Sequence, residues 1–297
     1  MNAHLPRLRP FHAIPFVLLA ACAAEAPEPR AFDARLAWAH LGEQVAFGPR
    51  VAGLPPHQRQ RAWMRSQLGF RADTLVVQEF GTGKRRYANY FARWRPDAAE
   101  RVLLVTHWDS PEHATRDPED HLRRRPVPGA NEGASGTAVL MELAQILNET
   151  PPAVGVDILF TDGLEGGLGA RHFAANLPPG YRPRWAVYVD RVGDADLAIP
   201  MEASSARAAP AAVRRVWDAA RAAGMDSVFQ ARTGAALAGD HQVLNGAGIP
   251  TAAVMDPDYG RENELWRTVD DHLPGVRRES LGVVGTVLAA LVYAEKP

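Results

Sequence analysis

Short apolar runs recur along the chain and predict buried strands, because continuous Val, Ile and Leu positions suit a sheet that is covered on both faces. Two extended runs before them flank the segment "GTGKRR", which is typical of a hairpin turn. The predicted strands are residues 74–80, 87–94, 101–107, 154–162, 184–193 and 249–256.

Helical spacing of apolar residues appears between these runs. In residues 135–149, Val139, Leu143, Ile146 and Leu147 follow one face of a helix, and Ser135 suits the N-cap. The predicted helices are residues 33–47, 56–69, 135–149, 210–223 and 279–294. Strands that alternate with helices predict an α/β fold: a doubly wound, mostly parallel sheet with helices on both faces.

Residues 110–131 interrupt this alternation. The segment is polar and carries four prolines, and a loop of this length in a compact domain is usually functional or disordered. From Phe32 onward there is no second linker and no repeat, so we expect one domain over residues 32–297. The formal net charge of −1 gives no reason to expect a nucleic-acid partner.

The first residues have a different character. Arg7 and Arg9 precede an apolar stretch, residues 13–21, which is too short to span a bilayer as a mature helix and fits a secretory signal. The stretch ends in "LAAC", where Cys22 is the only cysteine. This resembles the lipobox of bacterial lipoproteins, in which the cysteine is lipidated; the alternative is a plain signal peptide with an incidental cysteine.

The lipobox resemblance implies a signal segment over residues 1–22, a tether over residues 23–31 and attachment to a membrane through a lipid anchor. Ala23, rather than Asp, follows the cysteine. By resemblance, this places the protein in the bacterial cell envelope, on the outer membrane and facing the periplasm.

Polar side chains follow three of the central strands. His107 and Asp109 come after the first, Asp162 and Glu165 after the second, and Asp190 at the end of the third. In a doubly wound sheet these strand ends converge on one crevice. Ordinary loop polarity could explain one such end, but three coinciding ends favour a site.

Other loops can add ligands to this crevice. The further candidates are Glu132, Asp240, His241, Asp270 and Asp271. Carboxylates with one or two imidazoles suit zinc or a similar divalent ion. Asp109 could accept the second ring N–H of His107 and fix its tautomer.

Six motifs then occur in a characteristic order: "THWDS", "GANEGASG", "FTDGLEGGLGARHFA", "YVDRVGDADLAI", "GDHQVLNGAGIPTAAVMD" and "LWRTVDD". Together they resemble the zinc aminopeptidase family that also contains glutaminyl-peptide cyclotransferases. The resemblance covers about residues 35–294. It implies a single three-layer α/β domain with a mixed sheet.

The resemblance also implies roles for individual residues. It assigns metal binding to His107, Glu132, Glu165 and Asp190. By the same resemblance Asp240 belongs to the proton network of the cyclases, and Trp266 helps to wall the substrate pocket. Asp109 and His241 are expected to support the ligands.

Three positions depart from the family pattern. Glu132 stands where aspartate is usual but can still ligate. Leu164 occupies the general-base position and cannot shuttle protons. Arg267 replaces a histidine ligand, and a guanidinium, which has no acceptor, cannot bind a cation. Arg267 could instead pair with one of the acids and supply the charge of an ion, leaving one weak zinc ion or none.

Three functions follow as hypotheses. The first is a glutaminyl cyclotransferase that acts on a peptide or protein N-terminus, with Asp162 or Asp240 as the acid/base in place of position 164. The second is an aminopeptidase that uses metal-activated water. This reaction depends even more on the missing general base and the missing histidine ligand. The third is a non-catalytic, envelope-anchored member of the fold that binds a peptide or a partner protein.

Overall fold

A computed structural model of the chain describes residues 28–297. The predicted signal segment with Cys22, and the first residues of the tether, therefore lie outside the described residues. Within the described part, no helix has both the length and the apolar character needed to cross a bilayer.

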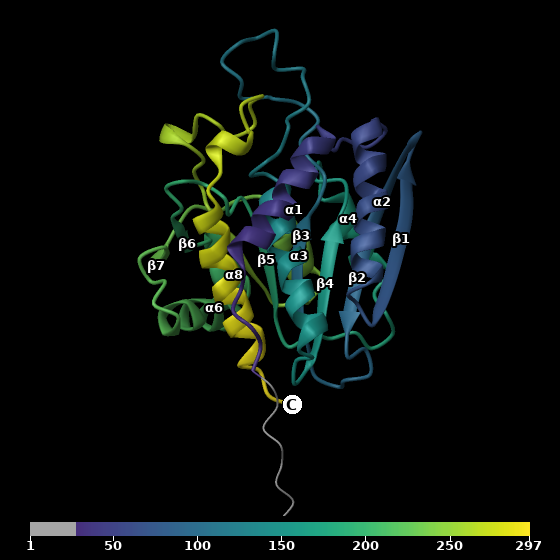
Figure 1. The fold of residues 1–297 in the computed structure, drawn as a ribbon, viewed down its shortest axis with the longest axis vertical. Helices are drawn as coiled ribbons and strands as arrows, with labels where there is room; N and C mark the ends of the chain where they lie inside the picture. The colour runs from purple at the N-terminus through teal and green to yellow at the C-terminus, as the bar shows by residue number, and fades with distance from the viewer. Residues whose placement is uncertain (1–27) are drawn as a thin grey trace, which may run out of the picture.

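A six-stranded mixed sheet forms the centre of the structure (Figure 1). The two outer strands on one side run antiparallel to their neighbours, whereas the other pairings are parallel. In sheet order, the strands are β1 (Thr74–Thr82), β2 (Arg85–Trp94), β4 (Gly155–Thr161), β3 (Arg101–His107), β5 (Ala186–Asp190) and β8 (Thr251–Met255).

Helices cover both faces of this sheet. α1 (Ala34–Phe47), α3 (Ala134–Glu149) and α8 (Arg278–Tyr293) pack against one another on one face, where α2 (Pro55–Gly69) and α6 (Pro210–Ala222) extend the layer. α4 (Leu168–Ala175) and α7 (Asp240–Gly246) pack on the opposite face. The fold is thus the three-layer α/β arrangement that the sequence predicts.

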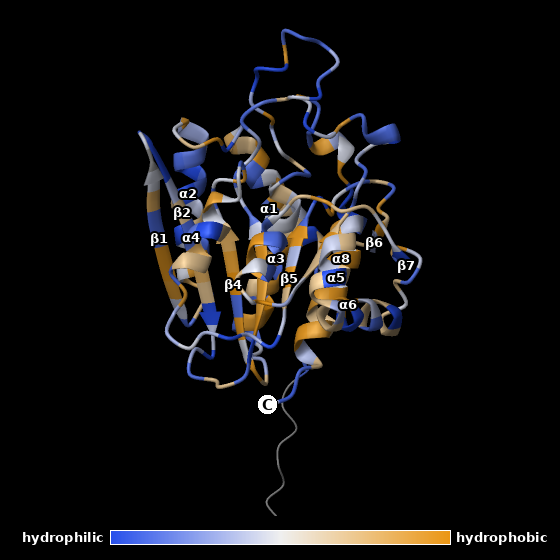
Figure 2. Cartoon of the chain, turned by 180° about the vertical axis from the view of Figure 1, so that it is seen from behind, coloured by the Kyte–Doolittle hydropathy of each residue, from blue (hydrophilic) through white to orange (hydrophobic). Residues whose placement is uncertain are grey.

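Each face of the sheet has its own apolar core, because successive side chains of a strand point to opposite sides. In β3, Leu104 joins the larger core beneath α3 and α8, whereas Leu103 joins the smaller core beneath α4 and α7. Both side chains are fully buried. Figure 2 shows the result as strands β4 and β5 that are mainly hydrophobic along their length.

Several short elements differ from the expectation. The sequence did not predict α4, α5 (Ala203–Ala208), α7 or the small parallel sheet of β6 (Ile199–Met201) and β7 (Phe229–Thr233). The N-cap prediction for Ser135 is wrong, since the cap of α3 is Gly133. The Ser135 hydroxyl instead donates to the carbonyl of Asn131 and accepts from the N–H of Val192, at 2.6 and 3.1 Å.

Residues 110–131 form a loop without helix or strand that projects at the carboxyl ends of the parallel strands (Figure 1). Its backbone is tied to itself and to the segment before α8: the N–H of Ala114 donates to Arg125, and the N–H of Arg116 donates to Arg267. The loop thereby brings Arg116 to the strand ends where the candidate site lies.

Candidate functional site

His107 and Asp190 end two neighbouring parallel strands, β3 and β5, and meet at the carboxyl edge of the sheet. The Nε2 atom of His107 lies 3.1 Å from Oδ1 of Asp190, and both side chains are buried. Burial acts against a charged imidazole, but the carboxylates of Asp190 and Asp109 outweigh it and raise the pKa of His107. Although burial opposes it, His107 in turn lowers the pKa of Asp190.

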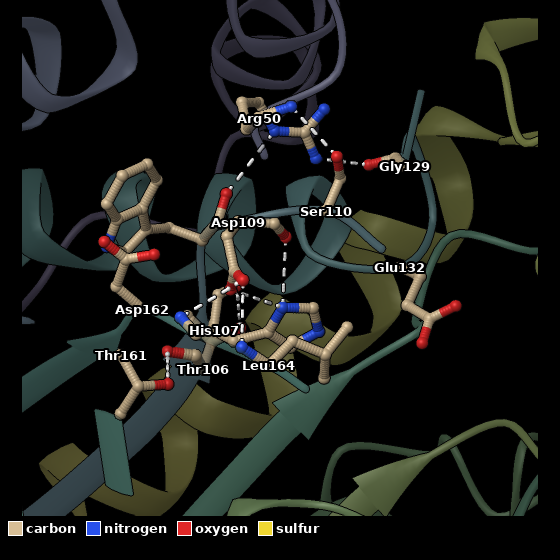
Figure 3. A network of polar contacts seen from close by, with 12 residues as sticks. Arg50, Thr106, His107, Asp109, Ser110, Gly129, Glu132, Thr161, Asp162 and Leu164 are labelled. Atoms are coloured by element: carbon tan, nitrogen blue, oxygen red, sulfur yellow. Dashed lines mark hydrogen bonds and ion pairs between the residues drawn. The ribbon is translucent and has the colours of Figure 1, made fainter. Parts of the chain in front are cut away.

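Asp109 connects this pair to the loop that follows β4. The Nδ1 atom of His107 lies 3.1 Å from the carbonyl oxygen of Asp109 and 3.4 Å from its Oδ1. The other carboxylate oxygen accepts hydrogen bonds from the backbone N–H groups of Gly163 and Leu164, at 3.1 and 2.9 Å (Figure 3). Asp109 therefore orients the imidazole and also fixes the loop that carries Leu164 and Glu165.

Arg267 lies where two of the predicted metal-binding acids face each other. Its Nε and Nη2 atoms donate to Oε1 of Glu132, both at 3.2 Å, and its Nη1 atom lies 3.3 Å from Oε1 of Glu165. Burial raises the pKa of Glu132 despite this pairing. Although burial opposes it, the two glutamates raise the pKa of Arg267. One guanidinium thus holds both acids.

Two buried groups hold the backbone around Glu132: Arg50, which the sequence analysis did not assign, and Asp271, which it named only as a candidate ligand. The Arg50 guanidinium donates to the carbonyl oxygens of Trp108, Pro128 and Gly129 and so links the end of β3 to the loop before α3 (Figure 3). The Asp271 carboxylate accepts from the N–H groups of Asn131 and Glu132, at 2.7 and 3.2 Å. No local motif signals either contact, because the partners are far apart in the sequence.

Asp162, one of the two predicted acid/base residues, points away from this cluster. In Figure 3, Asp162 and Glu132 lie on opposite sides of His107. The Asp162 carboxylate is bound by His57 Nε2, at 2.9 and 3.1 Å, and by the N–H of Ala88, at 2.7 Å. Burial raises the pKa of Asp162 to about 6. The structure therefore gives Asp162 a buried partner rather than access to a ligand.

Asp240 and His241 begin α7 and face different neighbours. Asp240 accepts a hydrogen bond of 2.5 Å from the hydroxyl of Thr161, and burial raises its pKa. His241 stacks on Tyr188 and lies 3.2 Å from the carboxylate of Glu202. Asp240 thus lies beside the cluster at the end of β4, whereas His241 is paired with a residue that the sequence analysis did not single out.

A cavity of about 710 Å³ opens over the cluster. Predicted site residues in its wall are Glu132, Leu164, Glu165, Asp190, Trp266 and Arg267. Its other charged lining residues are Arg116, Arg171 and Arg191, none of which the sequence analysis assigned. The volume lies in the range of small-ligand pockets, about 300–1,000 Å³.

The family resemblance implies zinc, and the side chains present do not fit such a site. A structural or catalytic zinc ion takes three or four His, Cys, Asp or Glu ligands in tetrahedral geometry. Here Arg267 places a permanent cation between Glu132 and Glu165. Within residues 28–297, no three His, Cys, Asp or Glu side chains are grouped so as to hold a metal ion.

The mixed sheet, the two helical layers and the acids at the strand ends define an exopeptidase-like α/β protein. The chain belongs to peptidase family M28, whose model matches residues 89–292. It is similar to aminopeptidase YwaD of Bacillus subtilis, with 28% identity over 176 residues that make up 56% of this chain and 37% of that protein. The chain therefore matches little more than a third of the length of this curated relative.

Solved structures match almost the whole chain. A glutaminyl cyclase from Bacteroides thetaiotaomicron, bound to N-acetylhistamine, has a TM-score of 0.86 at 27% identity and covers 91% of this chain and 100% of its own. A glutaminyl cyclase from Tannerella forsythia has a TM-score of 0.85 at 31% identity, with 90% and 100% covered. A Zn-dependent exopeptidase from Parabacteroides distasonis has a TM-score of 0.84 at 30% identity, with the same coverage.

Proposed function

We propose that the protein is a glutaminyl-cyclase-like member of family M28 that binds the N-terminus of a peptide or protein, and that Arg267 takes the place of zinc in its pocket. The observation that carries this proposal is the guanidinium of Arg267 between Glu132 and Glu165, at 3.2 and 3.3 Å. Because Arg267 occupies this position, we expect zinc binding to be weak and cyclisation to be slow or undetectable.

The pocket retains groups that suit a peptide N-terminus. The Oε2 atom of Glu132 is buried and has no hydrogen-bond partner among the described residues, so it can accept from the ammonium group of a ligand. Asp190 adds a second carboxylate to the same wall, and Trp266 adds an apolar face. These features support binding without requiring a metal ion.

Slow cyclisation is a second candidate function. The reaction joins the N-terminal nitrogen to the side-chain amide carbon of glutamine, releases ammonia and moves a proton from the amine to the leaving nitrogen. Leu164 cannot move that proton, and Asp162 is bound by His57. Asp240, which is not among the predicted metal ligands and directly follows the lining residue Gly239, is the remaining acid/base candidate, and burial raises its pKa. An aminopeptidase reaction has less support, because it needs a metal-activated water.

Restoring the two family groups tests the proposal. Arg267→His removes the competing cation and adds an imidazole, so the zinc content of the purified protein should rise. Leu164→Glu alone should do little, because an added carboxylate without a well-held ion has nothing to act on. The double variant should cyclise a Gln-peptide faster than the two single effects combined, since a general base typically contributes about 10²- to 10⁴-fold.

The matched control is Arg214→His, which introduces the same residue at an exposed position of α6. It should leave both zinc content and turnover as they are in the unmodified protein. Zinc content is measured by mass spectrometry of metals, and cyclisation by release of ammonia. Robust zinc-dependent cyclisation by the unmodified protein would contradict the proposal, because Arg267 would then not stand in for the ion.

We also propose that the protein is held in the bacterial cell envelope by a lipid on Cys22, facing the periplasm from the outer membrane. The support is the sequence "LAAC" and the lack of any other cysteine. Cys22→Ser should move the protein from the membrane fraction to the soluble fraction, because a lipoprotein anchor with several acyl chains holds far more firmly than one chain. A wild-type protein that is already soluble after cell fractionation would refute the anchor.

A further inference from the structure

Arginine side chains surround the indole of Trp266 in the wall of the pocket. The guanidinium carbons of Arg116, Arg191 and Arg267 lie 4.9, 5.1 and 5.9 Å from the centre of the Trp266 ring. The three arginines come from the 110–131 loop, the end of β5 and the segment before α8. Like charges repel, so this grouping needs anions nearby.

The acids of the pocket do not balance all of these cations. Arg267 is paired with Glu132 and Glu165. Arg191 reaches an acid only through Nε, which lies 3.7 Å from Oδ2 of Asp190, too far for a hydrogen bond. Among residues 28–297, Arg116 has no acidic side chain within 4.0 Å. Two guanidinium groups at the pocket therefore lack a carboxylate partner of good geometry.

Arg191 gives the clearest sign that a ligand group belongs here. The residue is only 3% exposed, yet its Nη1 atom has no hydrogen-bond partner within the described part of the chain. The indole N–H of Trp266 is buried and also has no partner there. Buried donors without acceptors are rare in folded proteins, because the lost hydration is not replaced. Both residues line the cavity, so a ligand that enters it can supply the missing acceptor.

The backbone of Arg191 supports the same view. Its φ angle is 51°, in the left-handed region that a residue with a long side chain rarely adopts. Strained conformations of this kind persist where the surrounding structure holds them, and they cluster at binding sites. Arg191 directly follows Asp190, so a negative and a positive side chain lie side by side in the pocket wall.

We propose that Arg116 and Arg191, which both contact the ring of Trp266, form a carboxylate subsite, and that the protein selects peptides whose second residue is acidic. This inference rests on the proposed binding of a peptide N-terminus. Glu132 and Asp190 accept the ammonium group, so a ligand that also satisfies the arginines carries a negative group close to its positive end. A guanidinium binds a planar carboxylate through two parallel hydrogen bonds.

Calorimetric titration of the full protein with short peptides tests this selection. Gln-Asp-Ala amide should bind about 10- to 100-fold more tightly than the isosteric, neutral Gln-Asn-Ala amide, as expected for charge-assisted hydrogen bonds. Added salt should reduce the difference. Arg116→Gln and Arg191→Gln should each remove most of the difference, whereas Arg191→Lys should keep part of it. Arg214→Gln, at an exposed position of α6, is the matched control and should retain it in full.

A second pair of ligands, Gln-Ala as the free acid and Gln-Ala amide, shows whether the arginines bind the side chain of the second residue or the C-terminal carboxylate. If only this pair shows a difference, the arginines bind the terminal carboxylate of a dipeptide, and selection by the second residue is wrong. Equal affinity for the Asp and Asn peptides, with equal affinity for the dipeptide pair, overturns the subsite altogether. Arg116 is exposed, so its variant tests the subsite even if a change at buried Arg191 affects folding.

N-acetyl-Gln-Asp-Ala amide separates this inference from the function on which it rests. If the acetylated and free peptides bind equally well, the ammonium group is not recognised and the proposed function fails. If the free amine is required but the Asp preference is absent, the proposed function stands and the subsite fails.

Discussion

At the scale of single residues, Arg267 sets the charge between two acids of the pocket. A histidine at this position offers a lone pair to a metal ion, whereas a guanidinium has only donors and keeps its charge at every accessible pH. Arg267 turns these donors toward Glu132 and Glu165 and is itself held at a φ of 55°. The acids are thus kept together by an internal cation, and exchanging Arg267 without adding another cation should leave Glu132 buried and unpaired.

Gly136 illustrates a second residue-scale constraint, at the first turn of α3. A Cβ atom there would lie 2.4 Å from the hydroxyl of Thr106 and 2.5 Å from the carbonyl oxygen of Val189. Gly136→Ala should therefore force α3 away from β3 and β5 and lower the free energy of unfolding by about 1–3 kcal/mol, as overpacking does. Urea unfolding followed by circular dichroism measures the change.

The control for this substitution is Gly42→Ala in α1, where a Cβ atom meets nothing within 4 Å. Alanine has the higher helix propensity, so this variant should be more stable by up to about 1 kcal/mol. If both variants change the stability by the same amount and in the same direction, the close approach at Gly136 is not what limits that position.

At the scale of elements, long and strongly patterned segments could be predicted from the sequence. The apolar runs of β3 and β4 and the helical stripe of α3 fall within a residue or two of their observed bounds. The mostly parallel sheet with helices on both faces follows from their alternation. Elements such as α5, β6 and β7 could not be predicted, because three to six residues are too few to show a period.

The candidate site, too, could be predicted from the sequence only in part. Residues at strand ends could be located from the sequence, since parallel strands place their carboxyl ends at one edge. The structure brings His107, Glu132, Glu165, Asp190 and Arg267 to this edge, although their roles stay predictions. Contacts between distant segments carried no local signal: His57 reaches Asp162 across 105 positions, and Arg50 reaches Gly129 across 79.

At the scale of the whole molecule, the fold buries several carboxyl groups that have no arginine or lysine partner among residues 28–297. Burial is the main cause in each case, and it raises the pKa of Asp162 to about 6 and those of Asp256 and Asp271 to about 7. Backbone N–H groups bind all three carboxylates. The folded protein therefore holds protons at a pH where the unfolded chain has already released them.

These raised pKa values predict how stability depends on pH. For Asp271 the folded pKa of about 7 lies above the unfolded value near 4, so its contribution is fully present below pH 4 and is lost as the pH rises to about 7. A group that differs by one proton between the two states changes the free energy of unfolding by about 1.4 kcal/mol per pH unit. If Asp271 no longer titrates, the slope of the free energy of unfolding against pH should become less steep by up to about 1.4 kcal/mol per pH unit.

Asp271→Asn is the variant that tests this, by urea unfolding at several values between pH 4.5 and pH 7.5. Its absolute stability should fall, because one amide oxygen cannot replace both hydrogen bonds to Asn131 and Glu132, but the slope against pH is what decides. His40, whose pKa burial lowers to about 4, titrates in the opposite sense and is common to both proteins, so its effect cancels in the comparison. Asp218→Asn, on the exposed face of α6, should leave the slope unchanged. Parallel slopes for the wild type and Asp271→Asn would mean that Asp271 is already ionised in the folded protein.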